Sequence, residues 1–184
     1  MTVPLHIRRA ARVLDDGGVI AYPTEGVYGL GCLPDDYAAV TRILESKGRD
    51  PDKGLVVIAA ALAQVDDWIE LPPNPPDLSS SIDKPVTWIL PATDAVPWWI
   101  RGEHAGVAVR LTSHPVAKAL CEAAGSPLVS TSANVSGHPP ARNPYILRRQ
   151  FSRLVDCIVP GRCGPAGSAS EIRDLVSGKV LRPA

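Results

Sequence analysis

The sequence is organised around the stretch LVSTSANVSG, which occupies residues 128–137. If residues 128–134 are extended, the two-residue period of a strand places Ser130, Ser132 and Asn134 on one face. Such a row of hydroxyl and carboxamide groups can bind an oxygen-rich ligand, and Gly137 lets the chain turn away directly afterwards. A solvated edge strand rich in serine and threonine would show the same pattern. The stretch alone therefore leaves both interpretations open.

The length and charge of the chain limit what it can be. Its 184 residues suit a single domain, residues 1–184, large enough to bury a sizeable core without a metal or disulfide. Nineteen Lys and Arg residues balance nineteen Asp and Glu residues, so no overall field steers the protein toward nucleic acid or anionic lipid. Any anion site must come from a local cluster of cations.

The cysteines and the hydropathy pattern indicate the compartment. The four cysteines, Cys32, Cys121, Cys157 and Cys163, have neither metal-ligand spacing nor the density of a disulfide framework, which predicts reduced, buried thiols. The N-terminal residues lack an apolar core of signal-peptide length, and no apolar run is long enough to span a bilayer. We therefore expect a cytoplasmic protein without membrane contact.

Helical and extended patterns alternate along the chain, which predicts an α/β fold with a twisted, mixed sheet flanked by helices. Expected helices are 7–14, one from the Asp35–Asp36 cap to Gly48, 61–69, 115–124 and 145–151. Expected strands are 19–22, 55–59, 85–91, 106–111, 128–134, 154–159, 170–176 and 179–182. His114, in the first turn of its helix, is expected to face solvent.

Two sets of cations lie where ligands could reach them. Lys47 and Arg49 flank Gly48 at the expected end of a helix, where the helix dipole favours cations in any case, but where they could also bind phosphate. Arg110 lies at the end of a strand, either as the rim of the sheet or as a clamp for a carboxylate. Known nucleotide and hydrolase signatures (GxxxxGK[ST], GxGxxG in a βαβ unit, HExxH and GxSxG) do not occur.

Three separated motifs occur in order: PTEGVYGLG at 23–31, SKGR at 46–49 and STSANVSG at 130–137. Together they resemble the YrdC-like family, the threonylcarbamoyl-AMP synthases. The likeness runs nearly end to end and takes in PVT at 85–87, Val109-Arg110, SEIRD at 170–174 and Leu181-Arg182. It is closest in type to the short bacterial members without an appended C-terminal domain.

The resemblance implies a concave, cationic cleft on an α/β domain. It also implies a reaction that joins L-threonine, bicarbonate and ATP into threonylcarbamoyl-adenylate and pyrophosphate, for the N6-threonylcarbamoyladenosine modification of the tRNA base beside the anticodon. Residues matching the family's nucleotide contacts are Lys47, Arg49, Thr87, Ser132, Asn134, Ser170 and Arg182. Those matching its threonine contacts are Thr24, Arg110 and Ser130.

The chemistry that this implies needs no covalent intermediate, which accounts for the lack of a catalytic triad. Positioning and charge stabilisation should dominate, with Lys47 and Arg49 as the catalytic cations that neutralise the triphosphate. Mg²⁺ is expected to enter with ATP, held mainly by phosphate oxygens and water, so that we predict no dedicated metal site.

Four departures from the family pattern bear on affinity rather than on fold. Gly26 stands where Thr or Ala is usual, Asp50 replaces a proline after the Lys-x-Arg motif, Asn143 replaces a threonine, and residues 82–84 replace a Trp-Pro-Gly. Gly26 and Asp50 are expected to lie in the cleft, where the extra carboxylate of Asp50 would weaken phosphate binding.

Two other function classes fit parts of the pattern. An RNA-binding or ribosome-maturation module could use the same cationic cleft without making the adenylate, although zero net charge argues against tight nonspecific RNA binding. A carbamoyl-transfer domain of hydrogenase-maturation proteins would carry further modules that this chain lacks. The synthase ranks first, with the downstream threonylcarbamoyl-transfer proteins as expected partners and weak tRNA binding as an additional expectation.

Overall fold

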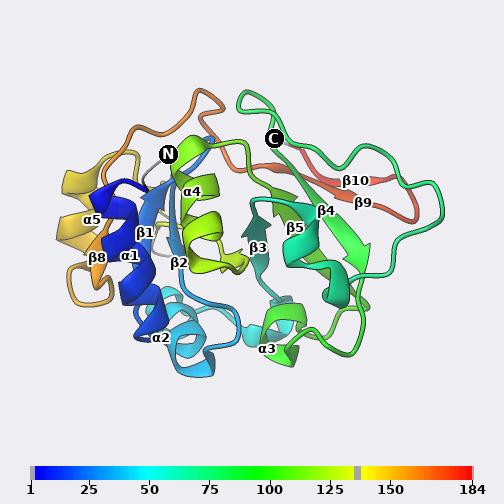
Figure 1. Ribbon diagram of the computed structural model, residues 1–184, viewed down its shortest axis with the longest axis horizontal. Coiled ribbons are helices and arrows are strands. Elements are labelled where there is room, and N and C mark those ends of the chain that lie inside the picture. The colour runs from blue at the N-terminus through cyan, green and yellow to red at the C-terminus, as the bar shows by residue number, and fades with distance from the viewer. Residues whose placement is uncertain (1–2, 135–137, 184) are drawn as a thin grey trace.

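The computed structural model describes residues 3–134 and 138–183 and shows two mixed sheets with helices packed around them (Figure 1). The α/β class and its mixed sheet character are as predicted from the sequence, but the strands form two sheets rather than one. The turn expected at Gly137 lies outside the described residues.

The smaller sheet has the order β7-β2-β1-β8. Its strands are β7 (Thr131–Ser132), β2 (Tyr28–Gly31), β1 (Ile20–Pro23) and β8 (Cys157–Ile158). β1 runs parallel to β8, and the other pairs are antiparallel. Of the strand expected over residues 154–159, only β8 forms as a strand, although backbone N–H groups on either side of it also bond toward β1, from Asp156 to the Val19 carbonyl and from Val159 to the Ala21 carbonyl.

The larger sheet has the order β10-β9-β4-β5-β3-β6. Its strands are β10 (Val180–Arg182), β9 (Glu171–Asp174), β4 (Val86–Pro91), β5 (Gly106–Leu111), β3 (Val56–Ala59) and β6 (Leu128–Val129). The pairs β3–β5 and β4–β9 are parallel, and the others are antiparallel. Figure 1 shows α1, α5 and β8 at one end of the molecule and β9 and β10 at the other.

The helices are α1 (Leu5–Asp15), α2 (Tyr37–Lys47), α3 (Trp98–Arg101), α4 (Pro115–Ala124) and α5 (Pro144–Phe151). The α2 helix begins because the Asp36 carboxylate accepts the backbone N–H of Ala39 at 2.9 Å, and it ends at Gly48, which is left-handed with φ 56°. Asn143 caps α5 in the same way through the backbone N–H of Ile146. The unusual asparagine therefore has a structural role.

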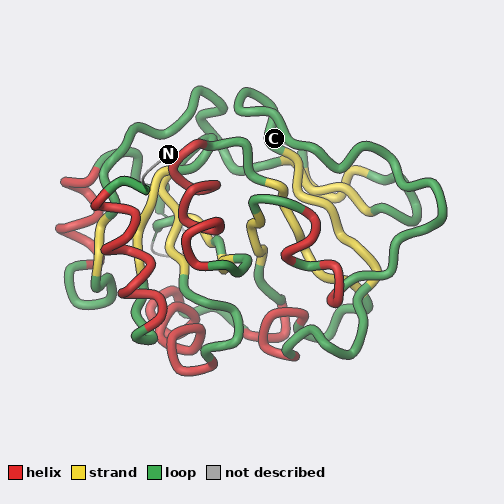
Figure 2. The backbone as a smooth tube through the Cα atoms, viewed as in Figure 1, coloured by secondary structure: helices red, strands yellow, loops and turns green. Residues whose placement is uncertain are grey.

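The helix expected over residues 61–69 is wrong. This segment forms two short 3₁₀ turns, η2 (Leu62–Gln64) and η3 (Asp66–Trp68), and a third such turn, η1 (Pro51–Lys53), follows Asp50. In Figure 2 these short turns are drawn with the helices, in red. The Gln64 side chain accepts from the backbone N–H of Ala60 and donates to the carbonyl of Cys121, and these contacts compete with a regular helix.

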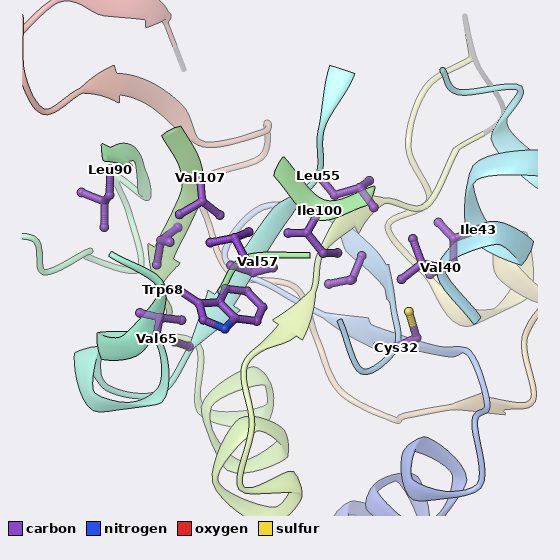
Figure 3. Packing of buried hydrophobic residues seen from close by; sticks show 14 of the residues in the cluster. Cys32, Val40, Ile43, Leu55, Val57, Val65, Trp68, Leu90, Ile100 and Val107 are labelled. Carbon is purple, nitrogen blue, oxygen red and sulfur yellow. The ribbon is translucent and has the colours of Figure 1, made fainter. Parts of the chain in front are cut away.

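Several apolar clusters fill the space around the sheets. Figure 3 shows part of the largest, in which Trp68 packs beside Val57 and Val65. Cys32 and Cys121 are buried as expected, but Cys157 and Cys163 are only half-buried, and all four are free thiols. Within residues 3–134 and 138–183, no helix is long and apolar enough to cross a membrane.

Candidate active site

The central stretch crosses from one sheet to the other at Ser130. β6 pairs with β3 in the larger sheet, whereas β7 pairs with β2 in the smaller one. The crossing is fixed by the backbone, because Ser130 N–H donates to the Val56 carbonyl at 2.8 Å. The strand predicted over residues 128–134 is therefore two short strands, and the strict alternation of faces fails.

A cleft of about 570 Å³ lies between the sheets at this crossing. It is lined by the loop at Thr24, by parts of β2, β3, β5 and β9, by residues 168–170 and by the C-terminal strand β10. Ser130 and Ser132 both line it, as predicted, but Thr131 does too and Asn134 does not. Hydroxyl groups of this stretch therefore line a common cavity, although two short strands bring them there rather than one alternating strand.

The cleft is strongly cationic although the whole chain is neutral. Its lining includes five cations, Arg49, Lys53, Arg101, Arg110 and Arg182, and one carboxylate, Asp174, among the residues that the structure describes. Burial lowers the pKa of Arg182, and the charges of Arg110 and Arg49 lower it further. The Arg182 guanidinium is therefore close enough to both Arg110 and Arg49 to be repelled by them, an arrangement that favours a polyanionic ligand.

Seven of the ten predicted site residues line this cleft: Thr24, Arg49, Arg110, Ser130, Ser132, Ser170 and Arg182. Thr87, Lys47 and Asn134 do not line it; Thr87 and Lys47 are buried, and Asn134 is half-buried. Thr87 is fully buried, and its hydroxyl lies 2.6 Å from that of Ser170, so it supports a residue that faces the cleft. Arg182 donates to the Ser170 carbonyl at 2.7 Å, which joins β10 to the same position.

Lys47 is almost fully buried beside the cleft. Its ammonium donates to the carbonyl oxygen of Ser132 at 2.6 Å, to that of Asn134 at 2.8 Å and to Asn134 Oδ1 at 3.1 Å. Ser132 Oγ donates to the same Oδ1 at 2.7 Å. Lys47 therefore holds the turn that carries both residues.

Arg49 faces the cleft from the loop after α2. Its guanidinium donates to the Gly54 carbonyl through Nε at 3.3 Å and Nη2 at 2.8 Å. Burial lowers the pKa of Arg49 from its ordinary value. Asp50, expected in the cleft, is exposed and caps η1 by accepting the N–H of Asp52, and it is not among the lining residues. The weakening of phosphate binding expected from Asp50 therefore loses its structural basis.

The three residues matched to threonine lie together. Thr24 Oγ1 donates to the Val27 carbonyl at 2.7 Å, which fixes the loop, and Arg110 Nη2 lies 3.4 Å from Ser130 Oγ. Gly26 lines the cleft as expected, and a Cβ there would stand 1.9 Å from the Ser168 carbonyl. The glycine allows the loop at 168–170 to approach the Thr24 loop closely.

Sequence reasoning missed Glu25, Lys53 and Arg101. Glu25 is completely buried between two residues that line the cleft, and a carboxylate in the middle of a glycine-rich apolar loop was a signal of this. The expectation for His114 is wrong: it is buried, with Nε2 3.0 Å from the Arg162 carbonyl, because the glycine-rich segment 161–167 covers it.

Within the described ranges, no group of three or more His, Cys, Asp or Glu side chains is arranged to hold a metal ion. The side-chain metal donors that line the cleft are hydroxyl groups, the His104 imidazole and one carboxylate, Asp174, which is not the set of oxygen ligands of a Mg²⁺ cage. The lining thus offers charge and hydrogen bonds rather than metal ligands.

The profile of the Sua5/YciO/YrdC domain, described as "Telomere recombination", matches residues 12–184. The chain belongs to this family. It is 47% identical to a threonylcarbamoyl-AMP synthase of Xanthomonas axonopodis pv. citri, over 99% of this chain and 100% of the relative.

Solved structures agree with the fold. The crystal structure of P. abyssi Sua5 complexed with L-threonine is 34% identical with a TM-score of 0.83, over 96% of this chain and 53% of that one, so this chain spans about half of that protein. The crystal structure of E. coli YciO is 26% identical with a TM-score of 0.81, over 98% of this chain and 90% of that one.

Proposed function

We propose that the protein is an L-threonylcarbamoyladenylate synthase, which makes threonylcarbamoyl-AMP and pyrophosphate from L-threonine, bicarbonate and ATP for tRNA modification. The observation that carries the proposal is the cleft, in which five cations and one carboxylate line a cavity in a chain of zero net charge. Relatives matched over their full length bear the name threonylcarbamoyl-AMP synthase. That agreement favours the synthase over an RNA-binding module.

The cations suit two anionic substrates. Arg49 and Arg182 would bind the triphosphate, with Ser132 and Ser170 as hydroxyl partners of the nucleotide and Thr87 and Asn134 supporting them. Arg110 would bind the threonine carboxylate through two parallel hydrogen bonds, next to Thr24 and Ser130. Contact between Lys47 and the triphosphate stays a prediction; Lys47 lies near enough to Arg49 for that charge to lower its pKa.

The chemistry requires little beyond such positioning. The threonine amine adds to bicarbonate to give a carbamate with loss of water, and a carbamate oxygen then attacks the α-phosphorus as pyrophosphate leaves. Negative charge that develops on the phosphates would be stabilised by Arg49 and Arg182, and fixed geometry would replace a covalent intermediate. The residues of the cleft are of the types that this reaction needs.

Mg²⁺ forms part of this proposal as a component of the MgATP substrate. The donor set of the cleft fits an ion that phosphate oxygens and water hold, since Mg²⁺ seldom requires an all-protein cage. The ion would neutralise charge on the leaving pyrophosphate. One domain over residues 1–184, a cytoplasmic location, weak tRNA contact and transfer proteins that receive the unstable product are further parts of the proposal.

The test is to incubate the purified protein with MgATP, bicarbonate and L-threonine, and to measure pyrophosphate release and the adenylate by mass spectrometry. Pyrophosphate should depend on both threonine and bicarbonate. Arg110→Ala should chiefly raise the KM for threonine, and Arg49→Ala the KM for ATP. Absence of threonine-dependent pyrophosphate, together with tight RNA binding at physiological salt, would support the RNA-binding class instead.

A further inference from the structure

Glu25 is a buried charge for which the reaction as described has no use. It lies in the loop between Thr24 and Gly26, both of which line the cleft, yet its own side chain is fully buried and does not line it. Burial raises the pKa of this carboxyl, but the charge of Arg110 and the hydrogen bonds from Thr112 and Ser113 outweigh burial and lower the pKa overall. Glu25 is therefore ionised inside the protein.

The two oxygens of the Glu25 carboxylate have different surroundings. Oε1 accepts hydrogen bonds from Thr112 Oγ1 at 2.7 Å, from Ser113 N–H at 3.1 Å and from His114 N–H at 3.4 Å. Oε2 has no hydrogen-bond partner among the described residues, and Arg110 Nη2 lies 3.6 Å from it. One oxygen thus fixes the carboxylate to the start of α4, and the other faces the guanidinium.

Arg110 lies beside Glu25 on one side and lines the cleft on the other. Its side chain is 9% exposed, it lines the cleft, and its Nη2 lies between Glu25 and Ser130 Oγ. Its Nε is buried and has no partner in the described part of the chain. A guanidinium with unused donors beside a cavity is set to bind a carboxylate in a fixed direction.

From this geometry we infer that Glu25 is a positioning residue for Arg110, orienting its guanidinium toward the carboxylate of the amino-acid substrate. The inference rests on the proposed function. Holding a buried carboxylate is costly, and the contacts of Oε1 alone would tie the loop down equally well with a neutral amide. The charge of Oε2 is explained by the neighbouring cation.

The central variant is Glu25→Gln, which keeps an acceptor for Thr112 but replaces the charge that faces Arg110. The KM for threonine should rise about tenfold, as expected for loss of one coupled partner, while the KM for ATP stays within about twofold. Thr112→Val is the matched control, because it removes a bond to Oε1 and leaves Oε2 beside Arg110; its threonine KM should change by less than about threefold. Equal effects of both variants on the two substrates would show a purely structural role and overturn the inference.

A double-mutant cycle decides whether Glu25 acts through Arg110. In the Arg110→Ala background, Glu25→Gln should not raise the threonine KM further, because the group that it positions is gone. Additive effects would overturn the inference. So would a lower threonine KM in Glu25→Gln, which would mean that Glu25 only offsets the charge of Arg110.

Further measurements distinguish a failure to fold from a loss of the positioning role, and the role of Glu25 from the proposed function. If Glu25→Gln does not fold, Glu25→Asp keeps the charge and draws it back by one methylene, and the threonine KM should then rise by about threefold or more; an unchanged KM contradicts the inference. Wild-type protein that releases no threonine-dependent pyrophosphate refutes the proposed function itself. Active wild type with an unaffected Glu25→Gln variant refutes only the role of Glu25.

Discussion

Lys47 and Ser132 are 85 positions apart in the chain, yet the Lys47 ammonium lies 2.6 Å from the Ser132 carbonyl oxygen. The same ammonium binds two oxygens of Asn134. The end of α2 is thereby joined to the turn after β7, next to the cleft. Lys47 of the SKGR motif thus forms one hydrogen-bonded unit with Ser132 and Asn134 of the STSANVSG motif.

Lys47→Met should destabilise the protein, because it removes the three hydrogen bonds that the buried ammonium makes to Ser132 and Asn134. We expect a loss of about 2–4 kcal/mol in the free energy of unfolding, measured by urea denaturation, and a higher KM for ATP as the turn loosens. Lys53→Met is the control: Lys53 is exposed at the rim, and its replacement should cost less than about 0.5 kcal/mol. Equal stability of the two variants would contradict this role of Lys47.

The pH dependence of activity should reflect the same ammonium. Burial, with a smaller contribution from Arg49, lowers the pKa of Lys47 from 10.5 to about 8. Above that pH the neutral amine has two N–H groups for three acceptors, so kcat should fall as the pH rises past 8. In Lys47→Arg, which stays charged, this alkaline decline should move to higher pH; an unmoved limb would assign the decline to another group.

The free energy of unfolding should depend on the same proton in the opposite direction from activity, rising as the pH rises. The unfolded chain keeps the Lys47 proton to about pH 10.5, whereas the folded protein releases it near pH 8. Between these values the unfolded state binds more protons, so the Lys47 contribution to the free energy of unfolding rises with pH. Lys47→Met should therefore show a flatter pH dependence of unfolding in this window, measured by urea denaturation at fixed ionic strength.

Gly26→Ala should strain the backbone at the cleft where the Thr24 loop contacts residues 168–170. An added Cβ would lie 1.9 Å from the Ser168 carbonyl, a backbone atom that can move only with its loop. We expect a loss of about 1–3 kcal/mol in stability and higher KM values for substrates. Gly29→Ala is the control for stability, since its Cβ would meet only side chains, at 3.4 Å or more. A neutral Gly26→Ala variant would show that residues 168–170 adapt freely.

Variants at the contact between Thr87 and Ser170 can distinguish a loss of stability from a loss of substrate binding. Thr87→Val leaves the Ser170 hydroxyl without its 2.6 Å partner and should cost about 1–2 kcal/mol in stability. The double variant Thr87→Val/Ser170→Ala should recover most of that loss, because no polar group is then left unpaired. If Ser170 contacts the nucleotide, this double variant should have a higher KM for ATP than the wild type. A wild-type KM would show that Ser170 is not a nucleotide contact.

How far the sequence predicts this structure depends on whether local pattern or long-range contact decides. The apolar stripe of α1 and the Asp36 cap and Gly48 stop of α2 are local, and those helices form where expected. At residues 61–69 the contact of Gln64 with Cys121, 57 positions away, prevents the expected helix. At residues 128–134 the partners Val56 and Tyr28 lie in different sheets and divide the expected strand.

The site shows the same division. Arg49 and Arg110 stood out as cations where an element ends, and both line the cleft. The direction in which Lys47 and Asp50 point could not be predicted, because it depends on the turn at Ser132 and on η1. Glu25 stands out in the sequence as a carboxylate in a glycine-rich loop, but its partners Thr112 and Arg110 could not be predicted because they are remote in sequence.

Tripolyphosphate, which lacks threonine and adenosine, should bind the cationic cleft by itself. A ligand that binds only the folded state at about 100 times its Kd adds about 2.7 kcal/mol, or about 5–10 °C in unfolding midpoint for a chain of this size. The shift should shrink at high salt, because screening weakens the attraction.

In Arg182→Met the shift should fall by more than half, since the guanidinium that lies close to both Arg110 and Arg49 is removed. Arg173→Met is the matched control: Arg173 lies on β9 beside Trp88 and Glu171, outside the cleft lining, so its shift should match the wild type. Equal shifts in both variants would place the anion site elsewhere on the protein.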